Sequence, residues 1–263
     1  MDLGLSGRAA LVAAASRGLG KASATALASE GAAVAICARD RGQLEATRDE
    51  IAEATGGMVV AIPADVSAEG EARRFVREGA EALGGCQILV ANAGGPPTGR
   101  FEELDDDRFR AAADLLLFSA LGMAREAIPR MREAGYGRVV VISSLAVKQP
   151  VPNLILSNSI RAAVIGWART LADEVARDGI TVNAVLPGRV LTDRVRSLME
   201  EDAAAAGRSL EDQQRATEDA IPAGRLGDPR EVGDLVAFLC SERAAYLTGC
   251  SIQVDGGAHR GLL

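Results

Sequence analysis

The fold is decided by the stretch RAALVAAASRGLGKASATALASE, residues Arg8–Glu30. An apolar run, Ala9–Ala15, ends in a turn that contains Gly18 and Gly20, and an alanine-rich helical segment follows and stops at Gly31. The pattern predicts strand, turn and helix. Free N–H groups and the positive end of the helix dipole then face the turn, where glycine lets a diphosphate approach the backbone. An ordinary strand-to-helix corner has the same pattern, so the turn alone identifies no site.

Apolar runs alternate with helical stretches along the remaining chain. Strands are expected at Ala9–Ala14, Ala33–Ala38, Met58–Ile62, Gln87–Ala91, Arg138–Ser143, Thr181–Leu186 and Ser251–Val254. Helices are expected at Asp40–Ala54, Ala68–Leu83, Asp105–Ala134, Asn153–Asp178 and Asp228–Ser241. This alternation predicts an α/β fold, a single doubly wound, Rossmann-like parallel sheet of seven strands with helices on both faces. Ligands of such sheets lie at the carboxyl ends of the strands.

Length and composition set the limits of the class. The 263 residues, 48% hydrophobic and 25% charged, suit one globular domain over residues 1–263, since no linker divides them. No apolar run approaches 18 residues and the N-terminus has no signal-peptide pattern, so we expect no membrane span and a cytoplasmic location. A net charge of −7 argues against nucleic-acid binding. Four scattered cysteines and the single His259 predict reduced thiols and no metal site.

One charged, alanine-rich piece, Gly188–Ile221, interrupts the last crossover of the pattern. A solvated helical insertion would have this composition. We favour a lid over the substrate, at about residues 189–221, because insertions at this end of a sheet are often mobile lids.

Several short motifs carry a resemblance to a known family. The turn Ala14–Gly20, AASRGLG, resembles the nucleotide turn of the short-chain dehydrogenase/reductase family, with Ala14 where the family usually has its first glycine. Asp65-Val66, Ala91–Gly94 and Pro187-Gly188 with Thr192 resemble later family motifs, and Val254–Gly257 resembles the closing V-D-G-G. The motifs run in unchanged order and resemble members of the 3-oxoacyl-(acyl-carrier-protein) reductase type.

The resemblance implies a dinucleotide pocket and its residues. Arg39 after the second strand, together with Arg17, favours the 2′-phosphate of NADP(H), while Asp40 keeps NAD(H) as the alternative. Asn92 has a structural interpretation too, as a brace of the sheet. The implied cofactor-binding residues are Ala14, Ser16, Arg17, Gly18, Leu19, Gly20, Arg39, Asp65, Val66, Asn92, Ala93, Gly94, Pro187, Gly188, Val190 and Thr192.

The catalytic positions depart from the family pattern. Ser144 matches the family's carbonyl-orienting serine, but the family's Y-x-x-x-K spacing falls on Ser157 and Arg161, and the helix asparagine position is Leu116. A serine hydroxyl is a far weaker acid than a phenol, and arginine is a fixed charge that stabilises an oxyanion or holds a carboxylate. Lys148 is a candidate replacement acid, since lysine is rare in this chain; a solvent-exposed loop lysine is the alternative.

These observations predict an NAD(P)(H)-dependent oxidoreductase that acts on a carbonyl or hydroxyl group of a small molecule, with Ser144, Arg161, Ser157 and Lys148 as candidate catalytic residues. Two alternatives remain. One is a nucleotide-binding protein with little redox activity, and the other is a non-redox lyase or dehydratase on a carboxylated substrate held by Arg161, Arg189 or Arg194. Family members pair their long helices, so the resemblance also implies a homo-oligomer, a dimer or tetramer.

Overall fold

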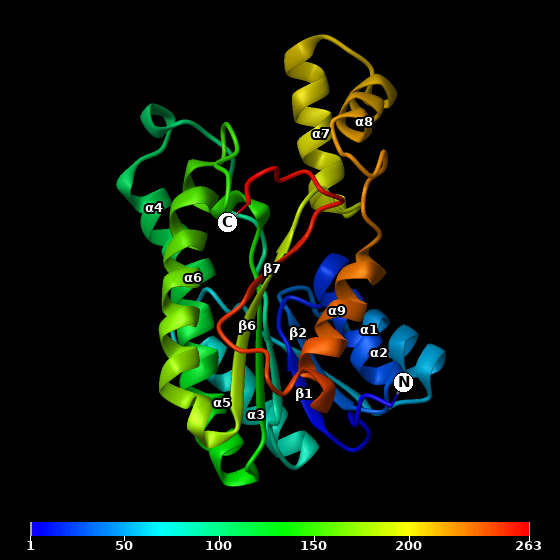
Figure 1. The fold of residues 1–263 in the computed structure, drawn as a ribbon, viewed down its shortest axis with the longest axis vertical. Helices are drawn as coiled ribbons and strands as arrows, with labels where there is room; N and C mark the ends of the chain where they lie inside the picture. Colours follow the sequence, from blue (N-terminus) through cyan, green and yellow to red (C-terminus); the bar gives the residue numbers. More distant parts are fainter. Residues whose placement is uncertain (1, 263) are drawn as a thin grey trace.

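Seven parallel strands form one sheet at the centre of the computed structural model, which describes residues 2–262 (Figure 1). The sheet has the order β3-β2-β1-β4-β5-β6-β7, so the chain starts in the middle and winds outward in both directions. This confirms the predicted doubly wound α/β fold. The strands are β1 (Ala9–Val12), β2 (Ala33–Ala38), β3 (Val59–Pro63), β4 (Ile88–Ala91), β5 (Gly137–Ile142), β6 (Ile180–Pro187) and β7 (Ser251–Val254).

Helices cover both faces of the sheet (Figure 1). The first face is covered by α1 (Gly18–Ser29), α2 (Arg41–Thr55) and α9 (Pro229–Cys240), and the second by α3 (Glu71–Leu83), α5 (Ser119–Ala134) and α6 (Ile155–Val175). Successive strand residues alternate between the two apolar cores: Leu11 packs into the second, and Ala10 and Val12 into the first. The strands are buried on both sides, which explains their continuous apolar runs.

Local sequence signals place several helix ends where expected. The Asp40 side chain accepts a hydrogen bond from Gln43 N at the start of α2. Asp228 and Glu231 form a capping box at α9, with Pro229 in its first turn. Gly31 follows α1 with φ +84°, the left-handed conformation that ends helices.

Two expected elements are shorter or broken. The strand predicted through Ala14 ends at Val12, because Ala14 itself has φ +49° and leaves the extended conformation. The helix predicted over Asp105–Ala134 is divided into α4 (Asp106–Ala113), a π-helical segment (Asp114–Phe118) and α5. A π-helical segment inserts an extra residue per turn without changing composition, so apolar spacing did not indicate it.

Between β6 and α9 the chain forms α7 (Asp193–Ala206) and α8 (Leu210–Asp219), which project beyond the carboxyl ends of the strands (Figure 1). Met199 of α7 packs in a small apolar cluster with Ile221 and Leu226, which follow α8. The described residues also contain five short helical pieces: Phe101–Glu103, the π-helical Asp114–Phe118, Leu145–Val147, Ala176–Asp178 and Glu242–Ala244. None of the helices in residues 2–262 has the length and apolar character needed to cross a bilayer.

Candidate active site

The turn after β1 is fixed by contacts from two neighbouring strands. Ala15 N donates a hydrogen bond to Cys37 O of β2 at 2.9 Å. The Asn92 side-chain amide, just after β4, donates to Ala13 O and Ala14 O, both at 3.2 Å. Asn92 therefore does brace the sheet, and it holds Ala14 in its left-handed conformation, which costs a non-glycine residue about 1–3 kcal/mol.

The first turn of α1 depends on glycine. Gly18 has φ +56°, which favours glycine. A Cβ on Gly20 would lie 2.3 Å from Ala14 O, closer than any side chain tolerates. The backbone of the turn therefore packs directly on α1, and the N-terminus of this helix opens toward the carboxyl ends of the strands.

A cleft of about 560 Å³ lies at the carboxyl ends of β1, β4, β5 and β6, beneath α7. Gly94 borders open space, since a Cβ there would meet nothing within 4 Å. The glycine turn, the helix N-terminus and this open wall fit a dinucleotide. The predicted residues that line the cleft are Ala14, Arg17, Gly18, Leu19, Asn92, Ala93, Gly94, Ser144, Ser157, Arg161, Pro187, Gly188 and Thr192.

Two predicted residues lie beside this cleft with their groups engaged elsewhere. Ser16 contributes its carbonyl to the Thr47 hydroxyl at 2.8 Å. Val190 is 3% exposed, and its backbone pairs with Gly227. Its assignment to the cofactor stays a prediction.

The residues expected around the adenosine end lie outside the cleft. Arg39 is exposed at the end of β2, and Val66 is buried in the core beyond β3. Asp65 accepts hydrogen bonds from Ser67 N at 3.1 Å and Ser67 Oγ at 2.6 Å. Because β2 pairs with β1, and β3 with β2, these residues continue the edge at which the cleft opens.

Lys148 does not lie in the cleft. It is exposed in the loop after β5, whereas its neighbours Ala146 and Gln149 line the cavity. The structure therefore favours the solvent-exposed alternative for Lys148, and the polar groups at the reacting end are those of α6 and the β5 loop.

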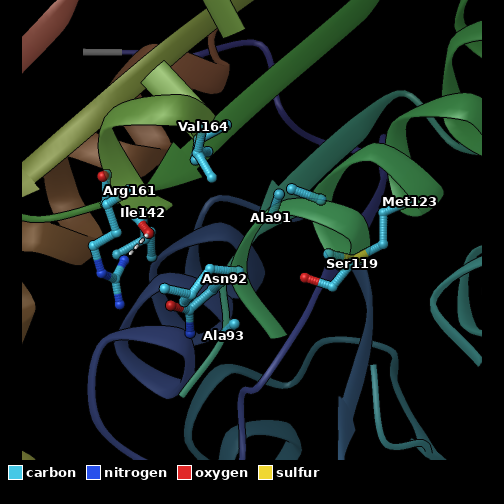
Figure 2. Close-up of a pocket in the computed structure, with 12 residues that line it drawn as sticks. Ala91, Asn92, Ala93, Ser119, Met123, Ile142, Arg161 and Val164 are labelled. Atoms are coloured by element: carbon cyan, nitrogen blue, oxygen red, sulfur yellow. Dashed lines mark hydrogen bonds between the residues drawn. The ribbon is translucent and has the colours of Figure 1, made fainter. Parts of the chain in front are cut away.

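Two serines and an arginine form the polar floor of the cleft. Arg161 Nε donates to Ser157 Oγ at 3.1 Å, one helical turn away on α6. Arg161 Nη1 donates to Ile142 O at 3.2 Å (Figure 2). Ser144 Oγ accepts from Ala146 N at 3.1 Å. Both hydroxyls use their oxygens as acceptors, which leaves their hydrogens available to a substrate oxygen.

Arg161 has no carboxylate partner within residues 2–262. Burial, and then the charge of Arg194, lowers the pKa of the Arg161 guanidinium to about 10. The group therefore stays protonated at neutral pH. A half-buried cation without a counter-ion is costly to hold, so this one is positioned to meet negative charge from a ligand.

No phenol among the described residues lines the cleft. Tyr136 lies just before β5, at the amino end of this strand and so away from the cleft at the carboxyl ends. Its hydroxyl donates to Cys240 O at 2.6 Å. Its ring lies between the guanidinium groups of Arg8 and Arg138, at 3.9 and 4.0 Å. Burial raises the pKa of Tyr136, and Tyr246 is fully exposed, so neither replaces the family's tyrosine.

A small enclosed hollow, of about 10 Å³, lies behind Arg161 and is lined by Asn92, Ser119 and Met123 (Figure 2). Leu116, in the π-helical segment, lies on its wall, and the motif spacing predicts this residue at the family's asparagine position. Ser143 Oγ is buried here without a hydrogen-bond partner, and the hollow has about the size of one water. Sequence reasoning missed Ser143, because only the fold reveals a buried hydroxyl that lacks a partner.

Two further arginines, Arg189 and Arg194, line the cleft, as does Asp193, which pairs with Arg17 at 3.4 Å. Arg194 extends from α7 to the loop after β4, where its NH2 donates to Pro96 O at 2.9 Å. Neither Arg189 nor Arg194 forms an ion pair within the described residues. The sequence had indicated both as candidates to hold a carboxylate.

This fold and cleft define a nucleotide-binding protein of the Rossmann-like class, with its site at the carboxyl ends of a doubly wound sheet. Residues 13–259 match a family model described as "Enoyl-(Acyl carrier protein) reductase". The chain belongs to the short-chain dehydrogenase/reductase family. This confirms the family predicted from the motifs, and with it the class of NAD(P)-dependent oxidoreductases acting on CH–OH or C=O groups.

Curated relatives cover nearly the whole chain. Glucose 1-dehydrogenase of Gluconobacter oxydans is 34% identical over 252 residues, 95% of this chain and 91% of the relative. A 3-oxoacyl-(acyl-carrier-protein) reductase of Vibrio cholerae is 33% identical over 257 residues, 98% of this chain and 99% of the relative.

Solved structures are similar over the same length. The L-sorbose reductase of Gluconobacter frateurii, complexed with NADPH and L-sorbose, has a TM-score of 0.95 at 32% identity and covers 100% of both chains. An NADPH-bound short-chain oxidoreductase of Pseudomonas aeruginosa, described as containing an atypical catalytic center, has a TM-score of 0.86 at 33% identity and covers 96% of both chains.

Proposed function

We propose that this protein is an NADP(H)-dependent carbonyl reductase in which Arg161, Ser157 and Ser144 act in place of the family's tyrosine and lysine. The observation that carries the proposal is the protonated, half-buried Arg161, hydrogen-bonded to Ser157 and without a carboxylate partner, on the floor of the cleft. The glycine turn and the α1 N-terminus that would hold the cofactor line the cleft, while Ser157 and Arg161 stand where the motif spacing predicts the family's tyrosine and lysine.

NADP(H) is favoured over NAD(H) by the hydrogen bonds and ion pairs of the charged residues near the proposed adenosine end, Arg17, Arg39 and Asp40. The carboxylate of Asp40, which would serve a ribose hydroxyl, accepts from Gln43 N at 3.0 Å as the cap of α2. Arg39 has no ion-pair partner in the described chain, and Arg17 has a single, exposed one. Structures of the L-sorbose reductase and the Pseudomonas oxidoreductase both contain NADPH, in keeping with this choice.

The cofactor would be held by the glycine turn, the α1 N-terminus, Asn92–Gly94 and Pro187–Thr192. When bound, it supplies the hydride for reduction of the carbonyl carbon. Arg161 places a fixed positive charge beside the carbonyl oxygen, where negative charge develops. The hydroxyls of Ser144 and Ser157 donate hydrogen bonds to that oxygen, and the proton that completes the alcohol comes from water in the open cleft.

The substrate is proposed to carry a carboxylate, because the cleft holds Arg161, Arg189 and Arg194 and its only acidic group, Asp193, faces Arg17. The α7–α8 pair is proposed as the lid over this substrate. We also propose a homo-oligomer formed through the face of α5 and α6, which carries an apolar hollow lined by Leu121, Ile128, Trp167 and Leu171.

We further propose a cytoplasmic location, because the four cysteines form no disulfide.

The test combines binding, turnover and pH. NADPH is expected to bind more tightly than NADH by fluorescence titration, and a panel of carbonyl compounds is expected to include substrates. With Arg161 as the active cation, kcat/KM should be level through neutral pH and fall as pH rises through about 10, where the guanidinium loses its proton. Tight NADPH binding without oxidation across the panel would favour a binding protein instead. A basic limb well below the pKa of Arg161 would contradict its role.

A further inference from the structure

Arg194 lines the cleft, and its surroundings favour the binding of an anion. Its guanidinium extends from α7 across to the loop after β4, and its one hydrogen-bond acceptor in the described chain is Pro96 O, a neutral carbonyl. The side chain lies against the backbone, since a Cβ on Gly95 would be 3.0 Å from its Nε. A guanidinium has five N–H donors, so most of those on Arg194 are free.

Arg194 also faces like charge. Its charge helps to lower the pKa of Arg161, which lines the same cleft. The other charged groups of the cleft are the Arg17–Asp193 pair and Arg189. Arg189 borders an outer hollow as well, whose wall carries Glu201 and Asp202. Arg161 and Arg194 therefore line the cleft without an ion pair in the described residues, whereas Arg189, also without an ion pair, borders the hollow that carries those two acidic residues.

The wall beside these cations is apolar. Val151, Leu154 and Leu198 line both the cleft and the outer hollow, and so connect the reacting end to the outside. A substrate that fills this space has an anionic group at the inner end and a hydrocarbon part along the wall.

We propose that Arg194 is the specificity-determining residue of this enzyme, and that it binds the carboxylate of a 2-oxo or 3-oxo acid whose remaining chain is aliphatic. This inference rests on the proposed function. Arg161 serves the carbonyl oxygen, and Arg194 binds the carboxylate one or two carbons away. One substrate can reach both arginines because both line the same cleft, Arg161 from α6 and Arg194 from α7. Arg194 leaves Pro96 O to make a paired contact with the carboxylate, and so ties α7 to the substrate.

The test compares oxo acids with their neutral esters. The probes are 4-methyl-2-oxopentanoate and 3-oxohexanoate, each beside its methyl ester, with NADPH. Arg194→Leu is expected to raise KM for the acids about 30-fold, with kcat nearly unchanged, and to alter KM for the esters by less than about threefold. Arg194→Lys should recover part of the loss, because it restores the charge without the planar fork. Arg196→Leu, an exposed residue on the same helix, is the matched control and should change neither KM.

Two binding measurements separate this inference from the proposed function. Calorimetric titration of 4-methyl-2-oxopentanoate into NADP⁺-loaded protein should give a Kd that Arg194→Leu weakens by a similar factor. The Kd of NADPH should stay within about threefold, since a residue serving the cofactor diphosphate would change it. Equal effects on acid and ester, no calorimetric binding of the acid, or a large change in the NADPH Kd would each overturn the inference. If the enzyme reduced esters and acids equally well and Arg194→Leu changed neither KM, the proposed reductase activity would stand and this role of Arg194 would be refuted.

Discussion

The two halves of the cleft differ in how tightly their residues are constrained. On the β1–α1 side, Gly20 packs against Ala14 O, and Asn92 joins the turn to β4, so backbone contacts fix the geometry. On the α6 side, Ser157 and Arg161 interact mainly with each other and with Ile142 O. Binding a dinucleotide uses backbone groups that few sequences provide, whereas acid chemistry uses side chains that can be exchanged. The sequence accordingly predicts a single departure from the family motif on the β1–α1 side, at Ala14, and two on the α6 side, at Ser157 and Arg161.

The largest expected effect is on the constrained side. Gly20→Ala places a Cβ 2.3 Å from Ala14 O and must displace the turn from α1. We expect the Kd of NADPH to rise about 100-fold, which corresponds to about 3 kcal/mol, and the free energy of unfolding to fall by about 1–3 kcal/mol. Fluorescence titration and thermal unfolding measure both. Gly166→Ala, at an exposed helical glycine with open space around it, is the control. An unchanged NADPH Kd would refute the constraint.

The second prediction tests whether the β1–α1 side and the α6 side of the cleft act independently. Arg161→Met removes the fixed charge from the cleft floor and should lower kcat about 100- to 1,000-fold, while the Kd of NADPH stays within about threefold because the turn is untouched. Steady-state kinetics and titration test this. Arg169→Met, an exposed arginine farther along α6 that pairs with Asp173, should leave kcat unchanged. Loss of NADPH binding in Arg161→Met would mean that the two halves are not independent.

The third prediction concerns the exchanged side chains. Ser157→Tyr combined with Arg161→Lys restores a phenol and a lysine at the family's spacing, and should raise kcat on simple neutral ketones about tenfold. The gain is limited because Leu116 still occupies the asparagine position. Each single variant serves as a control and should show no gain. A folded, NADPH-binding double variant without improvement would argue against this alignment of α6.

The smallest effect tests the strain at the turn. Ala14 has φ +49°, which glycine adopts at less cost. Ala14→Gly should raise the free energy of unfolding by about 1 kcal/mol and tighten NADPH about twofold. Ala13→Gly, one residue earlier and fully buried, should instead lower stability. Thermal unfolding of the Ala14→Gly and Ala13→Gly variants tests this prediction. A loss of stability in Ala14→Gly would show that the Ala14 methyl group contributes packing that outweighs the backbone strain.

The sequence by itself determined the sheet, the order of its elements and the identity of the family. Those properties depend on local patterns: apolar runs, caps such as Asp228, and a glycine turn next to a helix. The assignment of the family's tyrosine and lysine positions to Ser157 and Arg161 stays a prediction, which rests on their spacing from Ser144 within one short segment.

The tertiary structure alone decided which groups meet and which lack a partner. Three findings are of this kind. Lys148 is exposed, Tyr136 lies between Arg8 and Arg138, and Arg194 reaches Pro96 O. Each depends on how elements that are distant in sequence pack together. The physical reason is that burial and charge balance depend on every element around a side chain, while the periodicity of a sequence reports only its own element. The missing counter-ions of Arg161 and Arg194 are properties of that assembled surface.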